Sequence, residues 1–200
     1  MLKKVAIFKA LDVEIKKQRG PVAVKDAYKG HHSLKEELSQ AGITILGEVA
    51  GGDPGRGQVR ESYKASTHAK SLVENGARAL SVATDKFLYF GEDKHLSEVR
   101  SHVKLPLIRR EFIFEEYQVE ESKILGADAI FLMPALLTEE RLQTLLYWRL
   151  IYVLIGSQPN NADRPYPACK RLAACGRSII ELLTAAEKVK YNFALFKQSL

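Results

Sequence analysis

The side chains best placed to do chemistry are charged residues at the ends of short apolar segments. Glu48 lies in the apolar segment 43–49, and Arg110 follows the segment 105–108. A guanidinium stays protonated in proteins, so Arg110 can bind a carboxylate or phosphate group but cannot deliver a proton near pH 7. Glu48 either orients such a cation or faces solvent. Arg109 is expected on the opposite face, because strand residues alternate.

A glycine-rich segment, 51–57, follows Glu48 and carries Asp53 and Arg56. Asp53 would repel a phosphate dianion, and Arg56 would partly offset that charge. No helix start with a phosphate-loop lysine follows, so the glycines alone are weak evidence for phosphate binding. Three further acids near the ends of the apolar segments, Asp85, Glu111 and Glu115, are interpreted as solvated loop or helix-cap charges.

The elements that must position these residues alternate along the chain. Helical spacing or caps mark the segments 1–19, 33–40, 62–75, 93–103, 115–125 and 138–148, and buried-strand composition marks 43–49, 79–83, 105–108 and 129–133. Gly76 and Gly126 end two of the helices and supply the left-handed conformation that a helix end often needs. This alternation predicts the α/β class, with right-handed βαβ units and a parallel sheet.

The regular pattern weakens after residue 148, which suggests two regions, 1–148 and 149–200. Residues 150–155 are a candidate fifth strand, 156–167 are a loop, and 168–190 have a helical pattern. We therefore expect four to five βα units with a helical C-terminal segment.

Composition narrows the function classes. The net charge is +6 and the sequence pI is about 9.2, but the basic residues are dispersed, which does not favour a nucleic-acid partner. The two cysteines, Cys169 and Cys175, and the five histidines lack metal-ligand spacing, so no metal site is expected. No apolar segment is long enough for a membrane span or a signal sequence, which favours a cytoplasmic protein.

The segment 48–57, Glu-Val-Ala-Gly-Gly-Asp-Pro-Gly-Arg-Gly, resembles the first βα loop of indole-3-glycerol phosphate synthases, Glu-Val-Lys-x-x-Ser-Pro-Ser-x-Gly. Other segments agree with that family in order and spacing: Leu-Ser-Val-Ala-Thr at 80–84, Tyr-Phe-Gly at 89–91, Leu-Pro-Leu-Ile-Arg-Arg-Glu-Phe-Ile at 105–113, Tyr-Gln-Val at 117–119 and Gly-Ala-Asp-Ala-Ile-Phe-Leu at 126–132. The resemblance covers about three quarters of the chain. It implies an incomplete (β/α) barrel of the TIM type.

The resemblance also implies a reaction. The family closes the indole ring of 1-(o-carboxyphenylamino)-1-deoxyribulose 5-phosphate with loss of carbon dioxide and water, in tryptophan biosynthesis and without a cofactor. A lysine acts as general acid on the substrate carbonyl. Such chemistry needs cationic groups at the carboxyl ends of the strands, where negative charge develops.

Several family positions are altered in this sequence. Glu48 matches the glutamate of the first strand, but Ala50 stands where the family has the lysine that holds the substrate carboxylate. Arg110 stands at the position of the general-acid lysine. Asp53 and Gly55 replace two serines, the first of which helps to bind phosphate. The resemblance therefore places Glu48 and Arg110 as catalytic positions, and Asp53 and Arg56 as substrate-phosphate positions.

Two main hypotheses remain open from the sequence. The chain is an indole-3-glycerol phosphate synthase homologue with impaired ring closure, or it is an inactive remnant or binding protein from a truncated or frame-shifted gene. An RNA-binding protein is the weakest alternative, since it rests on net charge alone. A half barrel has an open strand edge, so we expect a homo-oligomer or a partner chain that completes the barrel.

Overall fold

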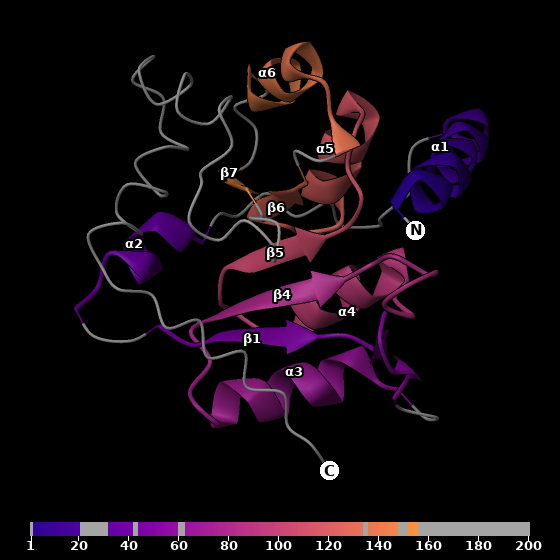
Figure 1. The fold of residues 1–200 in the computed structure, drawn as a ribbon. Coiled ribbons are helices and arrows are strands. Elements are labelled where there is room, and N and C mark those ends of the chain that lie inside the picture. The colour runs from indigo at the N-terminus through magenta and orange to yellow at the C-terminus, as the bar shows by residue number, and fades with distance from the viewer. Residues whose placement is uncertain are drawn as a thin grey trace.

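The computed structural model describes residues 2–20, 32–41, 44–59, 63–133, 136–147 and 152–155 (Figure 1). The helices are α1 (Leu2–Arg19), α2 (Leu34–Leu38), α3 (Ala65–Glu74), α4 (Asp93–His102), α5 (Glu116–Ile124) and α6 (Glu139–Tyr147). The strands are β1 (Leu46–Val49), β2 (Gly52–Asp53), β3 (Gly57–Gln58), β4 (Ala79–Ala83), β5 (Leu107–Arg110), β6 (Ala129–Leu132) and β7 (Tyr152–Ile155).

The main sheet is parallel and has the strand order β1-β4-β5-β6-β7. Each strand is joined to its neighbour through one helix, which confirms the predicted βαβ units. The candidate fifth strand is confirmed as β7, which pairs with β6 from Ala129↔Tyr152 to Leu132↔Ile155. Within the described ranges the sheet is open, with β1 and β7 as its edges, and does not close into a barrel. The predicted incomplete barrel is therefore confirmed for this part of the chain.

Local signals set the element ends. Ser33 caps α2, since its Oγ accepts a hydrogen bond from the backbone N–H of Glu36 at 3.2 Å. Gly76 and Gly126 follow α3 and α5 with φ values of +92° and +100°, as the predicted left-handed helix ends require. Strand β5 covers residues 107–110 instead of the predicted 105–108. It therefore includes both Arg109 and Arg110. The predicted helix at 168–190 and both cysteines lie outside the described residues.

One face of the sheet packs against α3, α4, α5 and α6 and forms the larger hydrophobic core. It takes alternate strand residues and the inner sides of the four helices, namely Val49, Leu80, Val82, Leu107, Ile130 and Leu132 from the strands and Ala69, Leu72, Leu96, Val99, Val119, Leu142 and Leu145 from the helices. This packing fixes which strand residues face the helices and which face the opposite side.

The opposite face corresponds to the interior of a barrel and carries a second, smaller cluster. Ala79, Ile108 and Ala129 pack there against Leu34 of α2, which is fully buried. Because α2 covers the amino ends of the strands, this face is apolar at that end. Its carboxyl end is free to hold polar side chains.

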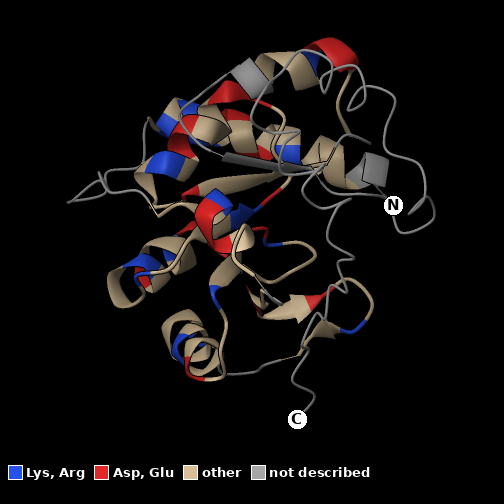
Figure 2. Ribbon diagram, turned by 90° about the vertical axis from the view of Figure 1, so that its left-hand side faces the viewer, with Lys and Arg blue, Asp and Glu red and all other residues tan. Residues whose placement is uncertain are grey.

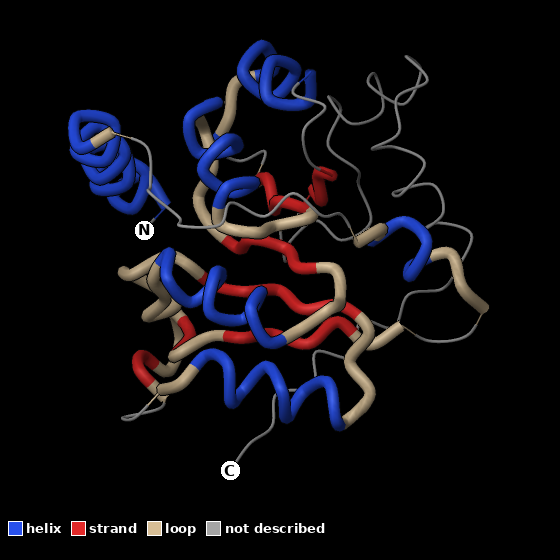
Figure 3. Tube along the Cα trace, turned by 180° about the vertical axis from the view of Figure 1, so that it is seen from behind, coloured by secondary structure: helices blue, strands red, loops and turns tan. Residues whose placement is uncertain are grey.

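Two further elements lie at the carboxyl edge of the sheet. Helix α1 lies beyond the ends of β4 and β5, on the side opposite to α2 (Figure 1). The glycine-rich segment after β1 forms the small antiparallel hairpin β2–β3, which the sequence did not predict, and this hairpin also lies past the strand ends (Figure 3). Side chains that leave the strands here are therefore surrounded by loops and by α1.

Candidate functional site at the carboxyl edge of the sheet

Glu48 and Arg110 meet on the inner face of the sheet. Strand β4 lies between their strands, with Glu48 paired to Ser81 and Arg110 to Ala83. Arg110 Nη1 donates to Glu48 Oε1 at 2.6 Å, and the two side chains keep 30% and 19% of their exposure. The ion pair is therefore partly open to solvent. The structure brings together the two residues that the sequence singled out as catalytic positions.

Tyr89, from the loop after β4, completes this group. Its hydroxyl accepts a hydrogen bond from Arg110 Nη2 at 2.8 Å, and its ring lies 4.4 Å from the guanidinium carbon. Its backbone carbonyl accepts hydrogen bonds from the N–H groups of Gly51 and Gly52, at 3.1 and 3.2 Å. No role for Tyr89 was predicted from the sequence, although its position in the loop after a strand end was a usable signal.

Asp53 and Arg56 lie in the turn of the β2–β3 hairpin. Asp53 Oδ1 accepts hydrogen bonds from the backbone N–H groups of Gly55 and Arg56, at 2.8 and 3.0 Å, so the carboxylate stabilises the turn. The Arg56 residue is exposed, while Ala50 is partly buried beside the site. The hairpin is tied to the site through the backbone contacts of Gly51 and Gly52 with Tyr89.

Arg109 points to the other face, as strand alternation predicted, and is fully buried. Its Nη2 donates to Asp93 Oδ1 at 2.6 Å and to Glu121 Oε2 at 2.7 Å, and its Nε donates to Thr84 Oγ1 at 3.0 Å. Burial alone would lower the pKa of Arg109, but Asp93 and Glu121 outweigh burial and raise it above its ordinary value. This guanidinium joins β5 to α4 and α5 and is not available to a ligand.

Asp85 and Glu111 are buried, which corrects their interpretation as solvated charges. Lys9 of α1, only 1% exposed, reaches Glu111 Oε2 at 2.9 Å and Asp85 Oδ1 at 3.6 Å. Burial raises the pKa of Glu111, although Lys9 and Arg109 pull it down. Glu115 does lie at the N-cap of α5, where it pairs with Lys17. The acids beyond the strands therefore anchor α1.

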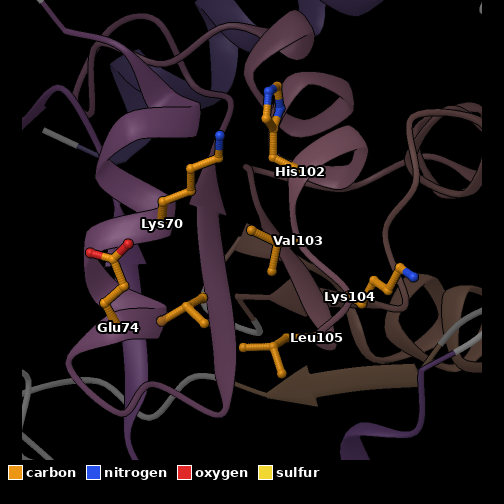
Figure 4. A pocket seen from close by; sticks show the side chains of 7 residues that line it. Lys70, Glu74, His102, Val103, Lys104 and Leu105 are labelled. Atoms are coloured by element: carbon orange, nitrogen blue, oxygen red, sulfur yellow. The ribbon is translucent and has the colours of Figure 1, made fainter.

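A groove lies on the opposite side of the sheet from this site. This groove, of about 290 Å³, lies between the ends of α3 and α4, lined by Lys70, Val73, Glu74, His102, Val103, Lys104 and Leu105 (Figure 4). These residues belong to the ends of α3 and α4 and to the segment that leads into β5, so the groove lies at the amino side of the sheet. That side of (β/α) barrels contributes to stability rather than to catalysis.

Three further expectations concern metals, membranes and nucleic acid. Among the described residues, no three His, Cys, Asp or Glu side chains gather as a metal site would need. None of the helices in that part of the chain is both long and apolar enough to cross a bilayer. For nucleic acid, the relevant feature is the charge distribution: Lys and Arg residues are interspersed with Asp and Glu residues along the helices (Figure 2).

Comparison with known proteins finds relatives that cover most of the described part of the chain. The family model described as indole-3-glycerol phosphate synthase matches residues 2–149. Proteins of that name from Lachnoclostridium phytofermentans and Thermoanaerobacter sp. are each 34% identical, over 135 and 145 residues, which is 64% and 70% of this chain. The matches cover 50% and 55% of those two proteins, so the chain spans about half the length of the curated relatives it matches.

A similar match joins the chain to the protein of the same name from Dichelobacter nodosus, which is 36% identical over 119 residues, 59% of this chain and 45% of that protein. Among solved structures, dihydropteroate synthase from Xanthomonas albilineans in complex with 7,8-dihydropteroate matches with a TM-score of 0.46 and 20% identity, over 76% of this chain and 56% of that one.

Proposed function

The chain belongs to the indole-3-glycerol phosphate synthase family, and we propose that it serves the same step of tryptophan biosynthesis. The substrate is 1-(o-carboxyphenylamino)-1-deoxyribulose 5-phosphate, and the reaction is its decarboxylative ring closure. We further propose that this chain binds the substrate but closes the ring slowly. Its partner is then a small phosphorylated molecule in the cytoplasm rather than a nucleic acid or a membrane.

The ion pair of Glu48 and Arg110 is the observation that carries this proposal. The two residues stand at the positions of the family's strand-end glutamate and general-acid lysine, and their side chains meet at 2.6 Å. A partly exposed guanidinium at the carboxyl edge of a barrel-type sheet can bind the carboxylate or phosphate of the substrate. Glu48 orients that guanidinium, as it would orient an ammonium group.

The same geometry explains why ring closure is slow. Arg110 remains protonated near pH 7 and therefore cannot act as the general acid. Ala50 carries no charge where the family has a lysine for the substrate carboxylate, and the loss of such a contact costs on the order of 2–5 kcal/mol. The site therefore keeps its anion-binding character but has lost both ammonium groups.

Restoring both lysines should raise turnover. We expect the double variant Ala50→Lys with Arg110→Lys to form indole-glycerol phosphate about 10–100-fold faster than the unaltered chain, because it regains a proton donor and a carboxylate contact. Product fluorescence measures the rate. Arg78→Lys, which changes a partly exposed arginine at the amino end of β4, on the side of the sheet opposite to the site, serves as the control and should leave turnover unchanged. A double variant that binds substrate yet gains no rate would contradict this explanation of the impairment.

A second variant tests whether the β2–β3 hairpin lies next to the phosphate group of the substrate. Asp53→Asn keeps a side-chain oxygen that can accept from the N–H groups of Gly55 and Arg56 but removes the negative charge. We expect its affinity for inorganic phosphate, measured by calorimetry, to rise about 3–10-fold, since like charges repel. Asp53→Ala is the matched control, because it removes the charge and the turn acceptor together. Unchanged phosphate affinity in Asp53→Asn would place the phosphate away from this hairpin.

The open edges of the described sheet point to completion by another polypeptide. A parallel sheet of barrel type is normally closed and buried on both faces, whereas β1 and β7 leave unpaired backbone groups within the described part of the chain. We propose that a second copy or a chain with the far half of a barrel covers these edges. Analytical ultracentrifugation tests this, and a chain that stays monomeric alone and with the separately produced far half would contradict it.

A further inference from the structure

We propose that the Tyr89 hydroxyl is the proton donor of this site, in place of an ammonium group. The inference rests on the proposed function, since it concerns the same ring closure. It goes beyond that function because it assigns the proton transfer to a residue on a different element, the loop after β4.

The direction of the hydrogen bond between Arg110 and Tyr89 carries the argument. A guanidinium can only donate, so the phenol oxygen accepts from Arg110 Nη2, at 2.8 Å. The hydroxyl hydrogen of Tyr89 is therefore free for another acceptor, and none of the contacts among the described residues uses it. Because Tyr89 is only partly buried, this hydrogen can reach a substrate atom at the carboxyl edge.

The backbone of Tyr89 is held from both sides. Its carbonyl accepts from Gly51 and Gly52 of the first loop, at 3.1 and 3.2 Å. The neighbouring Leu88 N–H donates to Asp85 Oδ2 at 2.7 Å, and the Gly91 N–H donates to the Asp85 carbonyl at 2.8 Å. A donor held in place before the substrate arrives needs little reorganisation during the reaction.

Other polar groups near Arg110 are poorer donors. Glu48 accepts a hydrogen bond from the Arg110 guanidinium. The Thr84 hydroxyl donates to Glu111 Oε2 at 3.1 Å. Glu111 belongs to the buried ion cluster of Lys9, Asp85 and Glu111. A phenol and an ammonium group have similar reference pKa values, about 10 and about 10.4. A phenol can thus perform the task that the family gives to a lysine.

The proton of Tyr89 enters the reaction when the ring closes. The aryl carbon attacks the substrate carbonyl carbon, a C–C bond forms, and the C=O π pair moves onto oxygen. That oxygen takes the proton of Tyr89, and the phenolate left behind is stabilised by the adjacent Arg110. Carbon dioxide then leaves, and its bonding pair restores the aromatic ring. The new hydroxyl group leaves with its bonding pair and takes a proton from solvent to become water. The neighbouring CH2 carbon gives a proton to the phenolate, so that its C–H pair forms the C=C bond of the indole and Tyr89 is again a phenol.

The test compares Tyr89→Phe with the unaltered 200-residue chain. Two quantities are measured: ring closure across a range of pH, and binding of a reduced substrate analogue that carries an alcohol in place of the carbonyl. Phenylalanine keeps the ring beside Arg110 and removes only the hydroxyl. We expect turnover to fall about 100-fold, analogue affinity to stay within about threefold, and the basic limb of the pH–rate profile to disappear. Tyr117→Phe on α5 is the control and should leave all three unchanged.

Two results would overturn the assignment of Tyr89. One is a Tyr89→Phe rate within threefold of the unaltered rate, and the other is an unaltered chain that binds the analogue yet forms no product. Failure of the unaltered chain to bind the analogue is a different result, because it removes the proposed function itself and this inference with it.

Discussion

Arg109→Met lowers the free energy of unfolding by an expected 3–5 kcal/mol, which is about the cost of breaking a buried ion pair by removing one partner. Methionine fills part of the same volume but leaves Asp93 and Glu121 without their shared guanidinium. It also removes the hydrogen bond that holds Thr84 and the contacts with the backbone carbonyl of Gln118 and with Ser122. Because these groups lie between β5, α4 and α5, the loss weakens the centre of the sheet–helix core.

The pH dependence of this variant follows from Asp93. Burial disfavours its carboxylate, but Arg109 and Lys16 outweigh burial and hold the pKa of Asp93 below its ordinary value. A carboxyl with a lowered pKa adds stability above its unfolded pKa and loses it as the pH falls through the folded pKa. Without Arg109 the attraction weakens while burial remains, so the deficit of the variant should shrink as the pH falls below about 4.

Denaturant unfolding at pH 7 and at about pH 3 measures both effects. Arg78→Met is the matched control, since Arg78 pairs with Glu37 at 2.8 Å but is 39% exposed, and it should cost no more than about 1 kcal/mol. Adding Asp93→Asn and Glu121→Gln to Arg109→Met should recover part of the loss, because the unpaired charges are then removed. Equal losses for Arg109→Met and Arg78→Met would contradict the role of the buried guanidinium.

Much of the fold could be predicted because the relevant signals are local. The segments 79–83 and 129–133 are short and apolar, and each is preceded by a helix end with glycine, so their assignment needed no tertiary information. Strand alternation alone separated the roles of Arg109 and Arg110, which the structure places on opposite faces. The sequence left Glu48 either orienting a cation or facing solvent, and the ion pair with Arg110 decides between these two interpretations.

The buried ion cluster could not be predicted for a physical reason. An acid at a strand end has the same local sequence context whether it faces solvent or a lysine, and Lys9 lies far away in the chain on α1. Only the docking of α1 buries Asp85 and Glu111, so their environment is a tertiary property. The hairpin β2–β3 was missed because its strands have two residues each, too few for a periodic pattern.

Helix α1 turns lysine side chains toward the sheet and leaves four large apolar side chains exposed. Its side facing the protein presents Lys9, Lys16 and the valines 5 and 13, whereas Ile7, Phe8, Leu11 and Ile15 are between 47% and 63% exposed. Lys16 contacts Asp93 and reaches Glu121 Oε1 at 3.5 Å. Ion pairs of Lys9 and Lys16, together with the two buried valines, therefore hold this helix against the carboxyl edge of the sheet.

Lys9→Met should release α1 from the rest of the protein. The variant leaves the buried Asp85 and Glu111 without their ion-pair partner Lys9, which would cost about 3–5 kcal/mol if the helix stayed in place. Undocking lets water reach both carboxylates, so the loss is limited to the docking free energy of α1. We expect amide exchange in α1 to rise at least about 100-fold while the sheet remains protected, as measured by hydrogen exchange with mass spectrometry.

The pH dependence of α1 release distinguishes the loss of the Lys9 ion pairs from a simple loss of packing. Burial raises the pKa of Glu111, so its contribution is favourable below its unfolded pKa and is lost as the pH rises through the folded pKa. Removing Lys9 raises that pKa further, and release of α1 should therefore be stronger at pH 7 than at pH 4.5. Lys86→Met is the control, because Lys86 is 56% exposed and approaches Asp12 only at 3.9 Å. If α1 is released equally at both pH values, or equally in the control, then apolar contacts and not the Lys9 pairs hold it at the site.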